Sequence, residues 1–151
     1  MKQPQLLIIG GANGSGKTTF AREIAAEKNI KYLGADDIAA SLNPSAPEKS
    51  AIDAARLFSQ RFDASLNGGE SLVVESTLSG LSLKKFLSKA RQNDYVISVF
   101  FVYLDSAELC IQRITARVAK GGHHVPETDV RRRFIRANKN FWQIYKDLAD
   151  D

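Results

Sequence analysis

The sequence predicts a three-layer α/β/α domain, in which helices cover both faces of a mostly parallel β-sheet. Short runs that are apolar on both faces alternate with segments of helical hydrophobic periodicity. The length of 151 residues, with 44% apolar and 25% charged side chains, fits one domain over residues 1–151. Because right-handed crossovers bring the carboxyl ends of the strands to one edge, we expect functional residues just after each strand.

The apolar runs predict four strands, at residues 6–9, 30–33, 72–74 and 95–104. After each of the first three, apolar residues recur at helical spacing, so each helix can cover one face of the sheet. The three stripes are Phe20, Ala21, Ile24 and Ala25; Ala51, Ala55, Phe58, Phe62 and Leu66; and Leu83, Phe86, Leu87 and Ala90.

Two more helices are expected after the fourth strand. Asp105, with Glu108 three residues later, predicts a capping box that opens a helix with Cys110 and Ile114 on its core side. A last helix is expected over residues 128–149, where aromatic residues around Trp142 favour packing over a base-stacking platform.

Charge and cysteine content limit the classes of partner. The formal net charge of +4 suits an anionic small molecule at least as well as nucleic acid. The single cysteine, Cys110, excludes an internal disulfide. No apolar run approaches the roughly 18 residues of a membrane helix, and the first apolar run is too short for a signal peptide. We therefore expect a cytoplasmic protein without a membrane partner.

The stretch GGANGSGKTT carries the most specific motif in the chain. It matches G-x-x-x-x-G-K-[ST], between an expected strand and an expected helix. In such a loop the backbone N–H groups bind phosphates, the lysine contacts the β- and γ-phosphates, and the threonine hydroxyl binds Mg²⁺. The sequence predicts a nucleoside triphosphate site for ATP or GTP, formed by Gly11, Ala12, Asn13, Gly14, Ser15, Gly16, Lys17, Thr18 and Thr19.

Acidic residues follow the second and third expected strands. Asp36 is predicted to be the base that deprotonates an acceptor hydroxyl, with Asp37 as a cap or a supporting partner. The alternative is that the two aspartates only cap the following helix. Glu75, followed by the hydroxyl residues Ser76 and Thr77, is predicted to bind the acceptor or Mg²⁺.

Thr18 and Glu75 are thus the predicted metal-binding residues. Asp105 is a rival for the metal-binding acid, because FFVYLD also resembles an apolar strand that ends in an aspartate. We prefer Glu75, since the predicted helix cap already accounts for Asp105.

Arginines flank a Gly-Gly hinge and favour phosphoryl transfer over hydrolysis. A mobile arginine pair that closes over the triphosphate neutralises charge and excludes water. We assign Arg117 and Arg132 to catalysis and Arg131 and Arg133 to binding of the substrate. Because three adjacent residues of a helix cannot all face the phosphates, the sequence leaves open which of the arginines at 131–133 does so. The alternative is a solvated basic helix start. The histidines at 123–124 are interpreted as lid residues, because they lack neighbours at metal-ligand spacing.

Four segments together resemble the zeta-toxin family of P-loop kinases, in the branch often labelled predicted ABC-type ATPases. They are GGANGSGKTT, GADDIAASLNPSAPE, VVESTLSG and RVAKGGHHVPETDVRRRF, and the likeness spans about residues 5–149. The resemblance implies a nucleoside-kinase-like P-loop NTPase fold with an arginine-bearing lid. It also implies transfer of the γ-phosphate to the 3′-hydroxyl of UDP-N-acetylglucosamine, and an antitoxin protein as partner.

Carried over residue by residue, the resemblance implies phosphate and Mg²⁺ binding by Lys17 and Thr18, catalysis by Asp36, and acceptor binding by Glu75 and Thr77. It also matches Arg117 and one of the arginines at 131–133 to the lid. Gly34 stands where many members of this branch have asparagine, and Ser76 where many have threonine, so acceptor contacts are expected to differ. Similar sequences continue into a further strand after LADD, so we expect a sheet of four or five strands.

Three functions remain open from the sequence. The first is a small-molecule kinase that acts on a hydroxyl of a nucleotide sugar. The second is a polynucleotide 5′-end kinase, and the third is a nucleotide-binding module without transfer activity. The predicted lid and Asp36 favour the small-molecule kinase, so nucleic acid is not the expected partner.

Overall fold

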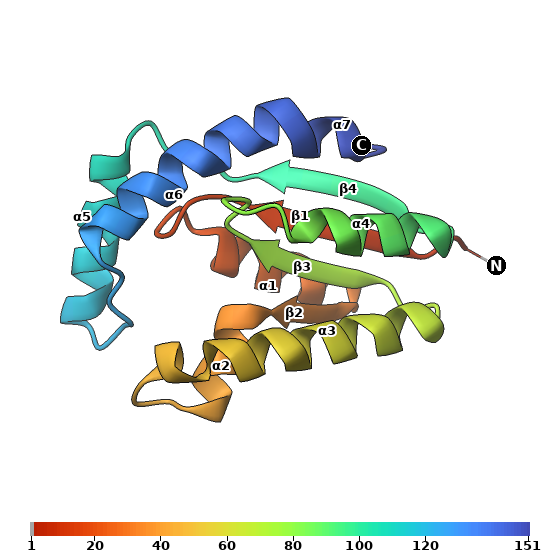
Figure 1. The fold of residues 1–151 in the computed structure, drawn as a ribbon, viewed down its shortest axis with the longest axis horizontal. Coiled ribbons are helices and arrows are strands. Elements are labelled where there is room, and N and C mark those ends of the chain that lie inside the picture. Colours follow the sequence, from red (N-terminus) through yellow and green to blue (C-terminus); the bar gives the residue numbers. More distant parts are fainter. Residues whose placement is uncertain (1) are drawn as a thin grey trace.

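The computed structural model describes residues 2–151 and contains a parallel β-sheet between two layers of helices (Figure 1). Over these residues the sheet has four strands, in the order β2-β3-β1-β4. The strands are β1 (Gln5–Gly10), β2 (Lys31–Gly34), β3 (Leu72–Ser76) and β4 (Val96–Phe101). The α/β/α class and the positions of the four strands are confirmed.

Side-chain alternation along β1 supplies both halves of the core. Leu7 and Ile9 face α1 (Lys17–Lys28), whereas Leu6 and Ile8 face α3 (Ala51–Asn67) and α4 (Leu83–Gln92). All four side chains are buried, as expected of a central strand of a parallel sheet. α2 (Ala35–Leu42) and the 3₁₀ turn η1 (Pro47–Ser50) connect β2 to α3.

The expected helical stripes are right for α1 and α4 and partly wrong for α3. Ala51 and Ala55 are exposed, and Ala54 is the buried residue in the first turn of α3. Ala54, Phe58 and Phe62 are spaced by four residues and therefore lie on the same face as Leu66. The ring of Phe86 packs edge-on against those of Phe58 and Phe62, which ties α3 to α4.

The cap of α5 (Ala107–Ala119) differs from the expectation. Ser106 is the N-cap residue, and its hydroxyl accepts a hydrogen bond from the Leu109 N–H group at 3.1 Å. The predicted cap at Asp105 is therefore wrong by one residue. β4 is also shorter than the expected range 95–104, because Leu104 leaves the sheet and packs against the core side of α5 instead.

The last helical segment contains a turn of π-helix. It consists of α6 (Glu127–Asn140), the π-helical η2 (Phe141–Tyr145) and α7 (Lys146–Leu148). Around Trp142, the side chains of Phe141 and Tyr145 pack against the core as expected, whereas Trp142 itself is 61% exposed. Beyond α7, the chain runs along the outer edge of β4. The Asp150 N–H group donates to the Ile97 carbonyl at 2.7 Å, and the Val99 N–H group donates to the Asp151 carbonyl at 2.9 Å.

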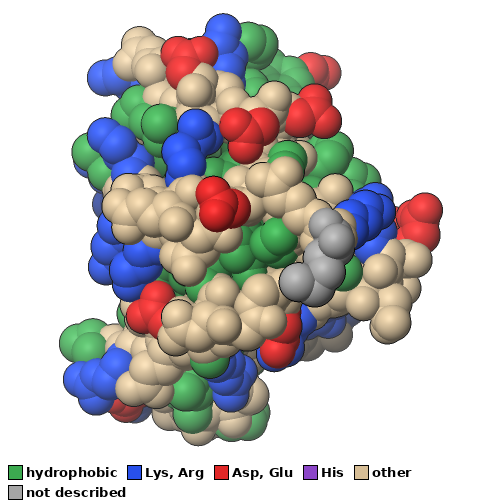
Figure 2. Space-filling model, turned by 90° about the vertical axis from the view of Figure 1, so that its right-hand side faces the viewer, with side chains coloured by type: hydrophobic (Ala, Val, Ile, Leu, Met, Phe, Trp, Pro, Cys, Tyr) green, Lys and Arg blue, Asp and Glu red, His purple; other side chains and the backbone are tan. Residues whose placement is uncertain are grey.

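Figure 2 shows the end of the molecule at which the strands begin. Lysine and arginine side chains gather along one edge of this face, and acidic and apolar side chains are interspersed elsewhere. Among residues 2–151, no helix is long and apolar enough to cross a membrane.

Candidate active site

The P-loop lies between β1 and α1 and has the backbone of an anion-binding loop. Gly14 and Gly16 adopt φ values of 80° and 92°, which favour glycine, and a Cβ at Gly14 would lie 2.7 Å from the Cys110 carbonyl oxygen. Gly16 is the N-cap of α1 and offers no capping side chain. The Ser15 hydroxyl is buried and has no hydrogen-bond partner among residues 2–151. The loop therefore leaves polar groups for a bound phosphate.

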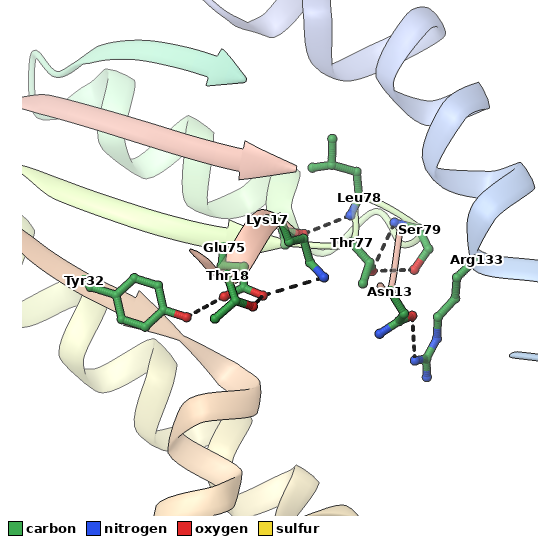
Figure 3. A network of polar contacts seen from close by, with 10 residues as sticks. Asn13, Lys17, Thr18, Tyr32, Glu75, Thr77, Leu78, Ser79 and Arg133 are labelled. Atoms are coloured by element: carbon green, nitrogen blue, oxygen red, sulfur yellow. Dashed lines mark hydrogen bonds and ion pairs between the residues drawn. The ribbon is translucent and has the colours of Figure 1, made fainter. Parts of the chain in front are cut away.

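Glu75, at the end of β3, joins the P-loop to the neighbouring strands (Figure 3). Its Oε1 atom accepts a hydrogen bond from Thr18 Oγ1 at 2.6 Å and lies 3.6 Å from Lys17 Nζ. The side chains of Lys17 and Glu75 are only 7% and 8% exposed, so water screens their attraction little. The structure thus brings together Lys17, Thr18 and Glu75, three residues assigned to the site from the sequence.

Tyr32 is a site residue that the sequence analysis missed. Its hydroxyl donates a hydrogen bond to Glu75 Oε2, and its ring lies beneath the guanidinium of Arg22. Burial and the adjacent Glu75 raise the pKa of Tyr32, so the hydroxyl remains a donor at neutral pH. One signal was present in the sequence: Gly34 lies two residues on, on the same face of β2, and a Cβ there would lie 2.5 Å from the Tyr32 hydroxyl.

Asp36 and Asp37 lie in the first turn of α2, but neither caps the helix. The N-cap is Gly34, in an extended conformation and without a side-chain hydrogen bond, so the capping alternative is wrong. Asp37 pairs with Arg22 on α1 at the surface. Asp36 makes no ion pair with any of residues 2–151. Its carboxylate is therefore available to a ligand.

Two cavities meet at Lys17, Asp36 and Glu75. The smaller, of about 310 Å³, lies between α3 and α4 and is lined by Phe58, Phe86, Ser76, Thr77 and Lys85 among others. The larger, of about 860 Å³, opens between the P-loop, α2 and the segment 123–126. A third cavity, of about 650 Å³, lies on the other side of the P-loop against α5. The P-loop therefore lies next to a separate cavity between α3 and α4.

Among the three adjacent arginines, Arg133 is the one that reaches the P-loop. Its Nη1 atom donates to Asn13 Oδ1 at 3.3 Å, and it lines the larger cavity. Arg132 instead pairs with Asp129 at 3.0 Å. Arg131 turns toward α5 and pairs there with Glu108, while Glu127 of its own helix also binds it; both carboxylates raise the pKa of Arg131. Neither Arg132 nor Arg131 contacts the P-loop in this structure, because successive helical residues point about 100° apart. Their assignment to catalysis and to the substrate stays a prediction.

Two residues of α5 flank the same loop. Arg117 lines the second and third cavities and donates from Nη2 to the His123 carbonyl at 3.2 Å, as a lid residue would. Arg113, which the sequence analysis did not assign to the site, donates from Nε to the Gly14 carbonyl at 2.7 Å. Its position four residues before Arg117, on the same face of α5, is the signal that could have identified it.

The oxygen atoms of Thr18 and Glu75 fit a shared Mg²⁺ site. A hydroxyl and a carboxylate lie 2.6 Å apart beside Lys17, at the phosphate end of the P-loop. No group of three or more His, Cys, Asp or Glu residues that could hold a metal by itself occurs among residues 2–151. Mg²⁺ characteristically completes its shell with phosphate oxygens and water, so two protein ligands are enough. Asp105 is exposed and lines none of the three cavities, so the preference for Glu75 stands despite the misplaced cap.

Two sequence comparisons identify relatives of this chain. A family model described as Zeta toxin matches residues 1–149. An uncharacterized protein of Haemophilus influenzae is 31% identical over 132 residues, which are 87% of this chain and 94% of that protein.

Solved structures share the fold. A chain of the Pnkp1/Rnl/Hen1 RNA repair complex superposes with a TM-score of 0.77 at 23% identity, over 95% of this chain and 47% of that chain. A chain from the PezAT chromosomal toxin-antitoxin system of Streptococcus pneumoniae gives a TM-score of 0.72 at 17% identity, over 99% of this chain and 67% of that chain. At these identities the likeness establishes a common architecture.

Proposed function

The chain belongs to the zeta toxin family, and from that premise we propose that this P-loop kinase transfers the γ-phosphate of ATP or GTP to a hydroxyl of a nucleotide sugar such as UDP-N-acetylglucosamine. One observation carries the proposal. Asp36, without an ion-pair partner among residues 2–151, lines the same two cavities as Lys17 and Glu75. A base, a phosphate-binding lysine and a pocket for the acceptor therefore share one junction.

The triphosphate would lie in the P-loop, where backbone N–H groups and Lys17 neutralise its charge. Arg133 and Arg117, on the lid side of the larger cavity, would bind the γ-phosphate as the lid closes. When bound by Thr18 and Glu75, Mg²⁺ would supply further charge neutralisation at the β- and γ-phosphates. The transfer depends on positioning, since the transition state has little covalent chemistry for the protein to perform.

The acceptor would enter the cavity of about 310 Å³ between α3 and α4. Its wall combines the rings of Phe58 and Phe86 with the polar side chains of Thr77, Ser82 and Lys85, which suits a ligand with both ring faces and hydroxyl groups. Asp36, at the mouth of this cavity, would accept the proton of the attacking hydroxyl. Glu75, anchored on both oxygens, would orient that hydroxyl or the metal.

The test is transfer of labelled γ-phosphate from ATP in the presence of Mg²⁺ to a panel of nucleotide sugars, nucleosides and oligonucleotides. We expect a nucleotide sugar to become labelled. Asp36→Asn should bind ATP normally but transfer phosphate about 10² to 10⁴ times more slowly, because the base is lost. The matched control is Asp53→Asn, which removes an exposed carboxylate that pairs with Arg56 and lines none of the three cavities, and it should retain activity.

Other outcomes of this experiment would contradict the proposal. Labelling of an oligonucleotide 5′ end alone would replace the nucleotide sugar by a polynucleotide acceptor. Tight ATP binding without any labelled acceptor would leave a nucleotide-binding module. A cytoplasmic location and an antitoxin partner, which the sequence led us to expect, stay predictions.

A further inference from the structure

The backbone just after β3 adopts a conformation that its own residue types do not favour. Leu78 has a φ of 58°, in the left-handed region that non-glycine residues rarely occupy, and its side chain is fully buried. Its neighbour Thr77 lines the proposed acceptor cavity. Such a conformation persists only where surrounding contacts hold it.

The P-loop side supplies one set of contacts. The Gly11 N–H group donates to the Ser76 carbonyl at 3.2 Å. The Leu78 side chain lies over Gly10, where a Cβ would come within 2.4 Å of Leu78 Cδ1. The start of this segment is therefore fixed against the end of β1.

The last helix supplies the other set. Asn140 Nδ2 donates to the Leu78 carbonyl at 2.8 Å, and the Tyr145 hydroxyl donates to the Gly80 carbonyl at 2.6 Å. Tyr145 is fully buried, and its side chain belongs to the main core cluster. Both hydrogen bonds join positions more than 60 residues apart in the chain, so they are tertiary contacts rather than turn contacts.

The π turn explains how both side chains reach the same segment. In an α-helix, residues five apart point about 140° away from each other. In a π-helix the hydrogen bond closes from i to i+5, so residues five apart lie about one turn apart on the same side. Phe141–Tyr145 is π-helical; Asn140 directly precedes this wide turn and Tyr145 is its last residue. π turns within helices occur frequently at functional sites.

We propose that Asn140 and Tyr145 are positioning residues for the acceptor: through the π turn they hold residues 77–80 in the conformation in which Thr77 meets the acceptor. The assignment of an acceptor rests on the proposed function. The helix that carries these two residues also carries Arg133, which donates to Asn13 of the P-loop. One helical element therefore orients groups at both substrate sites.

The test compares Tyr145→Phe and Asn140→Ala with the matched control Tyr95→Phe. Tyr95 is also buried and donates to two backbone carbonyls, those of Ser65 and Glu70, but it lies before β4 at the end of the sheet away from the site. Backbone hydrogen exchange of residues 76–81, the Kd for ATP and the KM for the acceptor are measured for each variant.

For Tyr145→Phe and Asn140→Ala we expect exchange of residues 76–81 to become about tenfold faster and the acceptor KM to rise about five- to tenfold. The Kd for ATP should stay unchanged. Tyr95→Phe should lower Tm to a similar extent without either effect. A purely structural role would make all three variants alike, and unchanged exchange in Tyr145→Phe and Asn140→Ala would also overturn the proposal. If the wild-type protein labels no acceptor, the proposed function fails, while the exchange measurement still decides whether Asn140 and Tyr145 hold residues 77–80 in place.

Discussion

The carboxylate of Glu75 is held by groups from two other elements. Thr18 of α1 binds one oxygen and Tyr32 of β2 binds the other, while Lys17 lies beside the first. Two anchored oxygens fix the orientation of the carboxylate before any ligand arrives, which lowers the entropic cost of binding. The absence of a Cβ at Gly34 makes the Tyr32 contact possible. The identity of residue 34 is thus set by a neighbour on its own strand.

Arg133 and Arg132 are adjacent in the chain but make different contacts, so their alanine variants can be compared directly. Arg133→Ala should slow phosphoryl transfer about 10²-fold, since it removes a cationic donor from the phosphate site. Arg132→Ala should leave transfer unchanged, because that side chain pairs with Asp129 rather than with the P-loop. Steady-state kinetics of phosphoryl transfer measure both variants. A larger loss of rate in Arg132→Ala than in Arg133→Ala would show that Arg132 is the arginine that acts in transfer.

The sequence predicted that the P-loop, Asp36 and Glu75 lie at one edge of the sheet, because each lies at the end of a strand or just after it. It could not select one arginine, because the rotation of α6 about its axis depends on packing against α5 and the P-loop. It missed Tyr32 because the contact with Glu75 exists only once β2 pairs with β3, placing Gly34 opposite Glu75. Local sequence patterns cannot predict the role of a residue when that role depends on which strands pair.

Among the elements, the start of α5 provides a test of stability rather than activity. Ser106→Ala should lower the free energy of unfolding by about 1 kcal/mol, because the Leu109 N–H group loses its acceptor. Asp105→Ala should change it by less than about 0.5 kcal/mol. Urea unfolding of both variants measures the difference. The reverse order of effects would restore Asp105 as the cap.

The last helix shows why the existence of an element is easier to predict than its geometry. Apolar residues at helical spacing correctly indicated a helix from about residue 128, but the same spacing hid the π turn at Phe141–Tyr145. Phe141 stacks on Phe101 and Tyr145 enters the core, while Trp142 between them turns outward. Helical spacing in the sequence shows only which residues are apolar. The π turn contains one more residue than an α-helical turn, and this determines which of the apolar side chains point into the core.

At the scale of the whole molecule, nucleotide binding should increase the free energy of unfolding. At a free ATP concentration 100 times its Kd, with Mg²⁺, the protein should gain about 2.7 kcal/mol by mass action and unfold at a higher temperature. Lys17→Ala should lose most of this gain, whereas Lys28→Ala, at the far end of α1, should keep it. Thermal unfolding with and without ATP provides the measurement. Equal stabilisation of the two variants would remove Lys17 from the binding site.

Alternation of strands and helices predicted parallel strands with right-handed crossovers, but it could not give the order of the strands. β3 lies between β1 and β2, although both precede it in the chain. A nascent chain that ends before residue 72 therefore has a gap in the middle of its sheet, with neither a partner for Tyr32 nor a carboxylate beside Thr18. Insertion of this one central strand joins β2 to β1 and brings Glu75 to Thr18 in the same step, whereas β4 and the arginines of α5 and α6 follow later in the chain.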